Sequence, residues 1–390
     1  MWRLTWRSLL RVLVGLSGGV DSAVAAYLLK QAGYDVTCCF MRNWDSLLNN
    51  DTLGNSTLNN DICPQESDYN DAKAVADKLG LELLRSDYVE EYWNYVFKNF
   101  IEEYEKGRTP NPDILCNKYI KFDYFLKFAQ EKGFDKIATG HYMKSVFEND
   151  KYNYYKAKDL SKDQSYFLAQ VDRTALDYTI FPLGDILKTE VRDIAHQLDL
   201  DIADKKDSTG ICFIGERNFR EFLKNYIPMK PGKIIDIDTL EEIGTHQGVY
   251  YYTTGQRKGF GVGGNKGPYY CAGKNVKENI LYLASINNED YLYSDKALIN
   301  DINWIEDIDE EIDIQCKFRY RQEDNEVHIQ KISDSSAILT YPQKIKSVTL
   351  GQQAVFYKDG RLLGGGVIDN TYIGDKDLAK SLDERVLNGK

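Results

Sequence analysis

Residues 12–29 read VLVGLSGGVDSAVAAYLL, and this stretch decides the fold of the first half of the chain. The apolar run at 12–14 predicts a buried parallel strand, and the apolar residues at helical spacing after residue 22 predict a helix. Between them lies a Ser/Gly turn, SGGVDS at 17–22. Such a turn directs bare backbone N–H groups and the positive end of a helix dipole to one point. The stretch therefore predicts an α/β domain with a phosphate site.

The residue types within the turn suit a bound phosphate. Gly18 and Gly19 let the backbone approach closely, because neither carries a Cβ. Asp21 is a candidate ligand for Mg²⁺, while Ser17 and Ser22 offer hydroxyl groups to phosphate oxygens. The stretch contains no GxxxxGK[ST] motif, which argues against a P-loop kinase or GTPase. The alternative is an ordinary glycine-rich turn that binds no ligand.

The hexapeptide at 17–22 resembles the pyrophosphate loop of the ATP pyrophosphatases. Members of that superfamily adenylate a carbonyl oxygen and then let a nucleophile displace AMP. GMP synthetase, argininosuccinate synthetase and the tRNA thiolases share the loop. The resemblance therefore implies ATP and a type of chemistry, and it leaves the substrate open.

Composition sets the broad class of protein. The chain has 390 residues, 43% of them hydrophobic, and it contains no apolar run near the roughly 20 residues of a membrane span. A net charge of −11 argues against nonspecific coating of nucleic acid, although a local basic surface remains compatible with it. We interpret the basic start, residues 1–10, as an unstructured extension.

The cysteines indicate a reducing compartment, and we expect a protein of the cytoplasm. They include no C-x-x-C pair, which argues against a zinc site, an iron–sulfur cluster or a disulfide framework. The seven cysteines stand at positions 38, 39, 63, 116, 212, 271 and 316.

Residues 11–225 alternate between strand and helix patterns, which predicts a doubly wound, mostly parallel α/β sheet. The Asn-rich residues 46–60 are expected to form a mobile loop. The predicted strands lie at 12–14, 36–41, 81–84 and 136–139, and the predicted helices at 68–79, 90–105 and 117–131.

After residue 225 the pattern becomes β-rich. We expect a central β-rich domain at 226–292, a C-terminal β-barrel at 293–372 and a tail at 373–390 that is either a helix or disordered. The glycine-rich residues 250–264 suit either an RNA grip or a hairpin. The predicted barrel strands lie at 313–319, 326–331, 336–341, 353–357 and 361–368.

Two cysteines lie in polar loops shaped by Gly and Pro. Cys116 follows Asp113 by three residues in GRTPNPDILCN, at the predicted start of a helix, whose N-terminus lowers the pKa of a thiol. Cys212 lies in DSTGICFIGER, where the nearby Arg217 would favour a thiolate. Both are candidate nucleophiles. Most of the other cysteines suit small buried core residues: Cys38, Cys39, Cys271 and Cys316.

Six motifs together indicate which family within the ATP pyrophosphatases the chain resembles. PNPDILCN, STGICFIGER, TGHY, KDQSYFL and GQRKGFGVGG accompany SGGVDS, and the set is similar to the tRNA-specific 2-thiouridylase family from about residue 11 to residue 370. That family adenylates the 2-carbonyl oxygen of the wobble uridine in tRNAs for Lys, Glu and Gln and then replaces the oxygen with sulfur. The resemblance implies ATP, Mg²⁺ and tRNA as ligands, and a sulfur-relay protein or cysteine desulfurase as sulfur donor.

The resemblance also implies roles for particular residues. Cys212 would carry a persulfide, Cys116 would be its partner nucleophile, and Asp113 would be the general acid/base. Turnover would leave a Cys116–Cys212 disulfide, formed after direct persulfide attack or after hydrosulfide release. The implied ATP-binding residues are Gly15, Leu16, Ser17, Gly18, Gly19, Val20, Asp21, Ser22, Met41 and Gly140. The implied contacts to tRNA and the flipped base are Asn111, Pro112, Asp113, His141, Lys162, Asp163, Gln164, Arg319, Tyr320 and Gln352.

Two other functions are compatible with parts of the chain. A small-molecule synthetase of the argininosuccinate or GMP type would use the same loop, but it needs neither the paired cysteines nor a β-barrel. A noncatalytic RNA-binding protein would have no use for the intact Asp113, Cys116 and Cys212.

Overall fold

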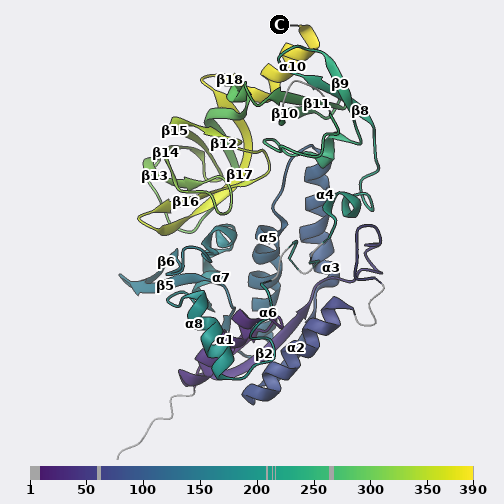
Figure 1. Cartoon of the computed structure of the whole chain (residues 1–390). Helices are drawn as coiled ribbons and strands as arrows, with labels where there is room; N and C mark the ends of the chain where they lie inside the picture. The colour runs from purple at the N-terminus through teal and green to yellow at the C-terminus, as the bar shows by residue number, and fades with distance from the viewer. Residues whose placement is uncertain are drawn as a thin grey trace, which may run out of the picture.

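The protein combines an α/β domain with two all-β units, as the computed structural model shows (Figure 1). Most of the predicted N-terminal extension lies outside the residues that the structure describes, as do residues 263 and 264 of the glycine-rich segment. The structure describes residues 9–58, 63–207, 210–212, 214–215, 217–262 and 268–389.

A five-stranded parallel sheet forms the centre of the α/β domain, in the order β3-β2-β1-β4-β7. Its central strand β1 is buried almost throughout, as its apolar run predicts. The order of the strands reverses between β1 and β4, and ligands bind in the crevice at such a point. The predicted doubly wound sheet is confirmed. The strands are β1 (Arg11–Gly15), β2 (Asp35–Arg42), β3 (Glu82–Asp87), β4 (Lys136–Ala138) and β7 (Thr179–Ile180).

The helices of this domain follow the predicted ranges closely. Two helices lie next to the sheet, α1 (Val20–Gln31) and α2 (Pro64–Leu79). Helix α2 begins four residues before the prediction, with Pro64 in its first turn, and ends at Gly80, whose φ of +59° suits glycine. The shorter helices are α7 (Arg173–Asp177), α8 (Lys188–Gln197) and α9 (Phe219–Leu223), with a 3₁₀ turn η3 (Ser165–Leu168) before α7.

Two long helices contain π-helical segments, which no sequence pattern predicted. The first runs as α3 (Val89–Tyr92), η1 (Trp93–Phe97) and α4 (Lys98–Glu105). The second runs as α5 (Pro112–Leu115), η2 (Cys116–Tyr124) and α6 (Phe125–Glu131), and so begins five residues before the predicted start.

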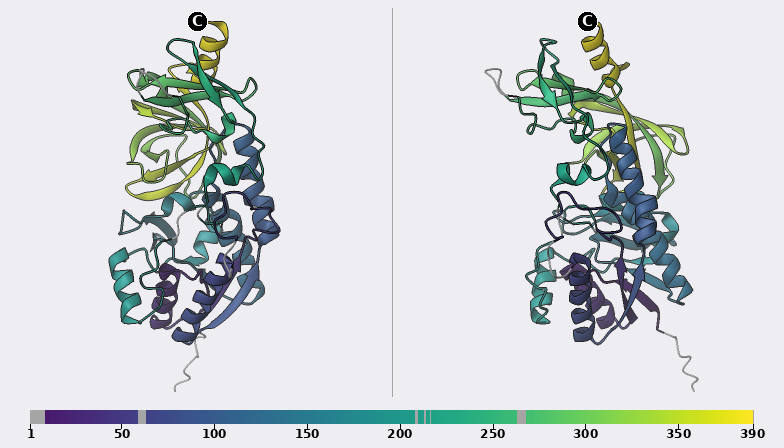
Figure 2. Two further views of the ribbon diagram at one scale, coloured as in Figure 1. Left: turned by 45° about the vertical axis from the view of Figure 1, so that its right-hand side comes forward. Right: turned by 90° about the vertical axis from the view of Figure 1, so that its right-hand side faces the viewer.

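A hairpin between the α/β domain and the barrel was also not predicted. It consists of β5 (Met143–Glu148) and β6 (Lys151–Lys156), and β6 pairs with β17 of the barrel through Tyr155 and Arg361. The left view of Figure 2 and the view of Figure 1 both place this hairpin below the barrel. The hairpin therefore joins the barrel sheet to the α/β domain.

The C-terminal barrel is closed and antiparallel. Its first strand β12 pairs with both β15 and β17, so the path β12-β15-β14-β13-β16-β17 returns to its start. The predicted barrel is confirmed, and β12 is the strand that the prediction missed. The strands are β12 (Tyr293–Trp304), β13 (Glu311–Lys317), β14 (Asn325–Ser333), β15 (Ser336–Lys346), β16 (Gln353–Lys358) and β17 (Arg361–Ile373).

A four-stranded sheet of order β10-β11-β8-β9 lies between the α/β domain and the barrel in sequence. The helical alternative for the tail is correct, because α10 (Leu378–Asn388) packs its buried Leu382 on this sheet (Figure 2). Residues 250–262 contain a 3₁₀ turn and no strand, so the hairpin alternative is wrong there. The strands are β8 (Gly232–Asp236), β9 (Glu242–His246), β10 (Tyr269–Asn275) and β11 (Ile280–Ser285). Among the described residues, no helix is both long and apolar enough to span a bilayer.

Candidate active site

The Ser/Gly turn joins β1 to α1 at the point where the sheet order reverses. The N-cap Gly19 offers no side chain to the first turn of α1, so the N–H groups there have no side-chain cap. Within the turn, the Ser22 Oγ accepts a hydrogen bond from the Ser17 backbone N–H at 3.1 Å and donates to the Gly19 carbonyl at 3.0 Å. The turn is therefore held from inside, and the uncapped N–H groups in the first turn of α1 suit an anion.

Three further predicted residues lie against this turn. A Cβ added to Gly140 would lie 2.7 Å from the Ser22 backbone nitrogen, and one added to Gly15 would lie 3.1 Å from the Met41 Cε. Gly18 has a φ of +75°, and a Cβ there would lie 2.3 Å from the Asp68 carbonyl oxygen. Leu16 and Val20 are buried beside them. The structure thus brings the predicted ATP-binding residues together, and their contact with ATP stays a prediction.

Two lysines beside the turn were missed by the sequence reading. The Lys188 Nζ lies 2.7 and 2.8 Å from the two carboxylate oxygens of Asp21, and the Tyr142 hydroxyl donates to Asp21 at 2.7 Å. The Lys205 Nζ donates to the Gly18 carbonyl at 3.1 Å. Both lysines come from segments far along the chain, so only the fold reveals them. Each is paired with two carboxylates here, so a bound phosphate would compete with those partners for the lysines.

The donor set around Asp21 forms an ion pair and does not resemble a metal site. Both of its oxygens already accept from Lys188, and a Mg²⁺ ion would have to displace that ammonium group. Among the described residues, no three His, Cys, Asp or Glu side chains cluster as a metal site would require. Mg²⁺ at Asp21 stays a prediction, and no step of the proposed reaction depends on it.

The two predicted cysteines meet, although 96 residues separate them. Cys116 begins η2, and its Sγ lies 3.6 Å from the Sγ of Cys212. A disulfide requires about 2.05 Å between the sulfurs, so the pair is reduced here and close enough to be oxidised after a small movement. Cys116 is buried and Cys212 is half-buried. The four predicted core cysteines are all buried, as expected.

Asp113 and Tyr92 hold the backbone of Cys212 from two sides. The Cys212 N–H donates to the Asp113 Oδ1 at 2.9 Å, and the Tyr92 hydroxyl donates to the Cys212 carbonyl at 2.8 Å. Asp113 itself lies in the first turn of α5, where the Asn111 side chain caps the Asp113 N–H at 3.2 Å. Pro112 is the first residue of that helix. Tyr92 is a positioning residue that no sequence signal indicated.

The pKa values of the two cysteine thiols shift in opposite directions, and that of Cys116 differs from the prediction. Burial and the neighbouring Cys212 raise the pKa of Cys116 well above its ordinary value, so the expected lowering by the helix N-terminus is wrong. A hydrogen bond from Cys116 and the nearby Lys121 lower the pKa of Cys212. Burial raises the pKa of Asp113, which is the direction that suits a general acid/base. Cys212 is therefore the thiol of the pair that ionises more readily.

Arg217 is not the cation beside Cys212. Its guanidinium forms an ion pair with Asp51 at 2.8 Å, and both side chains are almost fully buried. Asp51 also accepts from the Trp44 Nε1 at 3.1 Å, and the Gly54 carbonyl accepts from the Asn218 N–H at 3.1 Å. Residues 51–54 therefore pack against the chain that follows Cys212. The mobility expected of residues 46–60 stays a prediction, and residues 59 and 60 lie outside the described part of the chain.

We predict that Asp51→Asn lowers the free energy of unfolding by about 3–5 kcal/mol, because it leaves the Arg217 charge buried without a partner. Urea unfolding followed by tryptophan fluorescence measures this change, since Trp44 contacts Asp51 directly. Asp199→Asn, which removes an exposed partner of Lys78, is the matched control and should leave the transition unchanged. Equal effects of the two substitutions would contradict the buried-pair account.

Several residues predicted to contact tRNA make contacts within the protein. Asp163 is buried and accepts from the Ala157 N–H at 2.9 Å, while Gln164 accepts from the Tyr142 N–H at 3.0 Å. The Lys162 ammonium pairs with Asp207 at 2.7 Å. His141 is buried, and burial together with the charge of Lys121 lowers its pKa well below the ordinary value. The ring of His141 is therefore neutral. Contact of Lys162, Asp163, Gln164 and His141 with tRNA stays a prediction.

The three predicted residues of the barrel lie at its end nearest the α/β domain. Arg319 is exposed just after β13, which ends two residues earlier than predicted. The ring of Tyr320 packs on Phe167 with a centroid distance of 4.3 Å. The Gln352 Nε2 donates to the Thr109 carbonyl at 2.8 Å and so fastens the loop that leads to Asn111. Arg319 is the charged residue of the three, and its exposed guanidinium group can bind a phosphate from solution.

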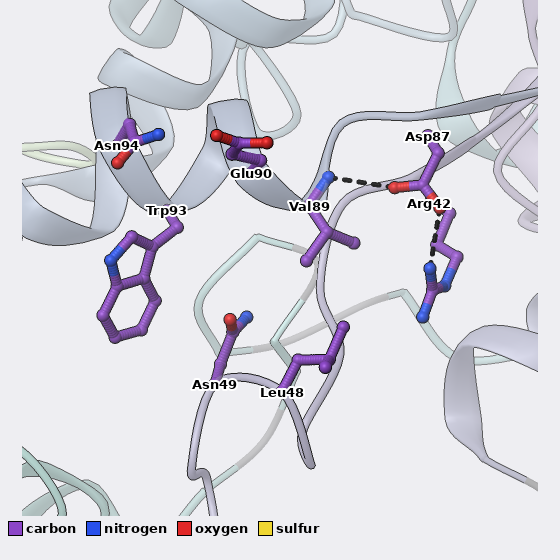
Figure 3. A pocket seen from close by; sticks show the side chains of 8 residues that line it. All are labelled: Arg42, Leu48, Asn49, Asp87, Val89, Glu90, Trp93 and Asn94. Carbon is purple, nitrogen blue, oxygen red and sulfur yellow. Dashed lines mark hydrogen bonds and ion pairs between the residues drawn. The ribbon is translucent and has the colours of Figure 1, made fainter.

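A separate hollow lies at the ends of β2 and β3 (Figure 3). In it Arg42 pairs with Asp87 at 2.7 Å, and Leu48 and Trp93 are among the lining residues. None of the predicted site residues lines this hollow. The candidate active site is therefore the region around the cysteine pair and the Ser/Gly turn. Gly140 packs closely against the turn. The charge of Lys121, which lies beside the cysteines, lowers the pKa of the neighbouring His141.

Fold and site together define a class of protein: a doubly wound α/β domain with two cysteines in contact and a Ser/Gly turn suited to phosphate, followed by a β-barrel. Comparison with known families agrees with this class. The family described as "tRNA methyl transferase HUP domain" matches residues 10–216. The "tRNA methyl transferase PRC-barrel domain" matches residues 220–285, and the "Aminomethyltransferase beta-barrel domain" matches residues 294–368.

Relatives named tRNA-specific 2-thiouridylase MnmA match nearly the whole chain. The one from Mycoplasma capricolum subsp. capricolum is 56% identical over 368 residues, which cover 92% of this chain and 98% of the relative. The one from Mesoplasma florum is 54% identical with the same coverage. The chain belongs to the tRNA-specific 2-thiouridylase family, as the six motifs predicted. A solved NMN synthetase from Francisella tularensis overlaps with a TM-score of only 0.31, at 19% identity over 51% of this chain and 66% of its own, and does not bear on the fold.

Proposed function

We propose that this protein is an ATP-dependent tRNA sulfurtransferase that converts the wobble uridine of tRNA to 2-thiouridine. The observation that carries the proposal is the approach of Cys116 and Cys212 to 3.6 Å in a domain that also holds a Ser/Gly turn suited to phosphate. The names of the relatives support the same activity. The barrel at residues 293–372 would bind the tRNA body, and the domain at 11–225 would carry out the chemistry.

The reaction has two stages. The 2-carbonyl oxygen of the uridine first attacks the α-phosphorus of ATP and expels pyrophosphate, which leaves AMP on that oxygen. The terminal sulfur of a persulfide on Cys212 then attacks carbon 2, and AMP leaves with the oxygen. Finally the Cys116 thiolate attacks the Sγ of Cys212, so that the C2–S group is released and a Cys116–Cys212 disulfide forms.

A second route reaches the same products. Cys116 attacks the persulfide on Cys212 first, and the released hydrosulfide then attacks carbon 2 of the adenylated uridine. Asp113 would act as general acid/base in either route, and its contact with the Cys212 N–H puts it next to the reacting sulfur. Both routes end with an oxidised pair, so a reductant must restore the two thiols before the next turnover.

The proposal includes specific ligands. ATP would bind at residues 15–22 with Met41 and Gly140, and Mg²⁺ would accompany its phosphates. The acceptors would be the tRNAs for Lys, Glu and Gln, and a sulfur-relay protein or a cysteine desulfurase would load Cys212. A target base flipped out of its stack would contact Asn111, Pro112 and Asp113.

Mass spectrometry of tRNA nucleosides tests the proposed function. The full-length protein is incubated with tRNA, ATP, Mg²⁺ and a persulfide donor, and the digested tRNA is searched for 2-thiouridine. We expect 2-thiouridine only when ATP and protein are both present. Pyrophosphate release that depends on a small molecule and not on tRNA would instead support a small-molecule synthetase.

We predict that Arg319→Ala weakens tRNA binding and lowers the slope of log affinity against log salt by about one, since one phosphate contact is lost. Filter binding over a range of salt concentrations measures the slope. Lys380→Ala, which removes an exposed charge on α10, is the control and should leave the slope as in the parent protein. A parental slope in Arg319→Ala would show that this side chain does not touch phosphate.

A further inference from the structure

The π-helical segment η2 brings two chemically active side chains to the same side of a helix. In an α-helix, a residue five positions along the chain points about 140° away from the first. The i→i+5 hydrogen bonds of a π-helix place residues five apart close to the same side, and such segments occur often at functional sites. Segment η2 begins at Cys116, and Lys121 is five residues later. The unusual helix geometry thus points Lys121 toward the same sulfur as Cys116.

Lys121 contacts the sulfur of Cys212. Its ammonium group is within hydrogen-bonding distance of Cys212 and also acts on Cys116 and Asp113 through its charge. Burial alone lowers the pKa of Lys121, but the neighbouring sulfurs outweigh burial and raise it. Lys121 therefore stays protonated at neutral pH, next to a half-buried sulfur.

The groups around the Cys212 sulfur come from the two long helices. Segment η2 supplies Cys116 and Lys121, α5 supplies the carboxyl group of Asp113, and α3 supplies the hydroxyl of Tyr92. Among these groups Lys121 is the one cation, and it offsets the effect of Asp113, which disfavours an anion on Cys212. Arg217, the other cation close in sequence, is neutralised by the buried Asp51.

We propose that Lys121 is a catalytic residue whose ammonium group holds the Cys212 sulfur as an anion, so that Cys212, and not Cys116, receives the incoming sulfur. The assignment of sulfur transfer rests on the proposed function. In the loading step, the Cys212 thiolate attacks the terminal sulfur of a donor persulfide, R–S–SH. The donor S–S bond breaks, R–S⁻ leaves, and Cys212–S–SH remains.

Cys116 has the complementary property in this account. It keeps its proton and donates a hydrogen bond to the Cys212 sulfur while Cys212 is loaded. Because thiolates and not thiols attack persulfides, the protonated Cys116 does not compete for incoming sulfur. The asymmetry between two cysteines in contact thus arises from the position of one lysine.

Alkylation of Cys212 by iodoacetamide tests the proposal without tRNA or ATP. The full-length parent, Lys121→Met and Lys121→Gln are treated over a range of pH, and the modified peptide is quantified by mass spectrometry. We expect both substitutions to raise the midpoint pH for Cys212 by about one to three units. Alkylation near neutral pH should fall at least about tenfold, and Lys121→Arg should restore part of it.

Lys127→Met is the matched control, because Lys127 lies on the continuation of the same helix and pairs with Asp123 at the surface. Thermal unfolding identifies the folded variants, and the two neutral substitutions differ in shape so that one can serve if the other is unstable. A parental alkylation profile in a folded Lys121→Met or Lys121→Gln would overturn the proposal. A shifted profile in a protein that does not thiolate tRNA would uphold the role of Lys121 at Cys212 and reject the proposed function.

Discussion

Replacing either Cys116 or Cys212 with Ser is expected to reduce tRNA thiolation by at least about a thousandfold, because the two sulfurs act as one unit. Serine neither stores sulfane sulfur nor forms a disulfide. The two variants should nevertheless differ with labelled sulfur. Cys116→Ser should still accept the label on Cys212, whereas Cys212→Ser should not hold it. Liquid chromatography of tRNA nucleosides measures thiolation, and peptide mass spectrometry locates the label.

Cys63→Ser is the control for this pair, since Cys63 is exposed and lies apart from both sulfurs at the start of α2. It should retain parental activity. Both active-site variants should still bind ATP and tRNA, because neither thiol belongs to the Ser/Gly turn. Label retained by Cys212→Ser, or full activity of Cys116→Ser with reductant present, would show that the two roles are assigned wrongly.

Asp113→Asn is expected to slow thiolation by about a hundredfold to ten-thousandfold, the range typical of a lost general acid/base. The amide oxygen of Asn can still accept the Cys212 N–H, so the loop that carries Cys212 should stay in place. Burial raises the pKa of Asp113, so it is protonated below that raised pKa and ionised above it. The rate of the parent should therefore titrate above the ordinary range of Asp, and this titration should vanish in Asp113→Asn.

Single-turnover kinetics with preloaded persulfide measures the rate over the pH range. Asp123→Asn is the control, because Asp123 is half-buried on the same helix and pairs with Lys127. Cys212 alkylation should not fall in Asp113→Asn, because the lost carboxylate disfavours an anion on Cys212. A parental rate in Asp113→Asn would remove Asp113 from the proton-transfer steps.

The features predicted from sequence are those that local patterns determine. The run at 12–29 combines a buried strand, a glycine turn and a helix, and all three are present between Arg11 and Gln31. Cys116 and Cys212 were selected because Gly and Pro shape the loops around them, and the structure places them in contact. Both predictions depend on residues close together in the chain, which explains why they could be made without the fold.

The features that were missed depend on contacts between distant segments. Arg217 is five residues from Cys212 in sequence, yet its guanidinium group pairs with Asp51, which lies 166 residues earlier in the chain. Lys121 takes its place beside the sulfur because η2 is a π-helix, and hydrophobic periodicity does not distinguish a π-helix from an α-helix over nine residues. The lysines at the phosphate turn, Lys188 and Lys205, approach it only through the packing of the domain.

The most direct test of the central claim is peptide mapping after one turnover without reductant. The full-length protein is loaded with persulfide, mixed with ATP and tRNA, quenched with an alkylating agent and digested without reduction. The account predicts a cross-linked peptide that joins Cys116 to Cys212, in an amount equal to the 2-thiouridine formed and absent when ATP is omitted. Formation of 2-thiouridine while both cysteines remain alkylated as free thiols would contradict it.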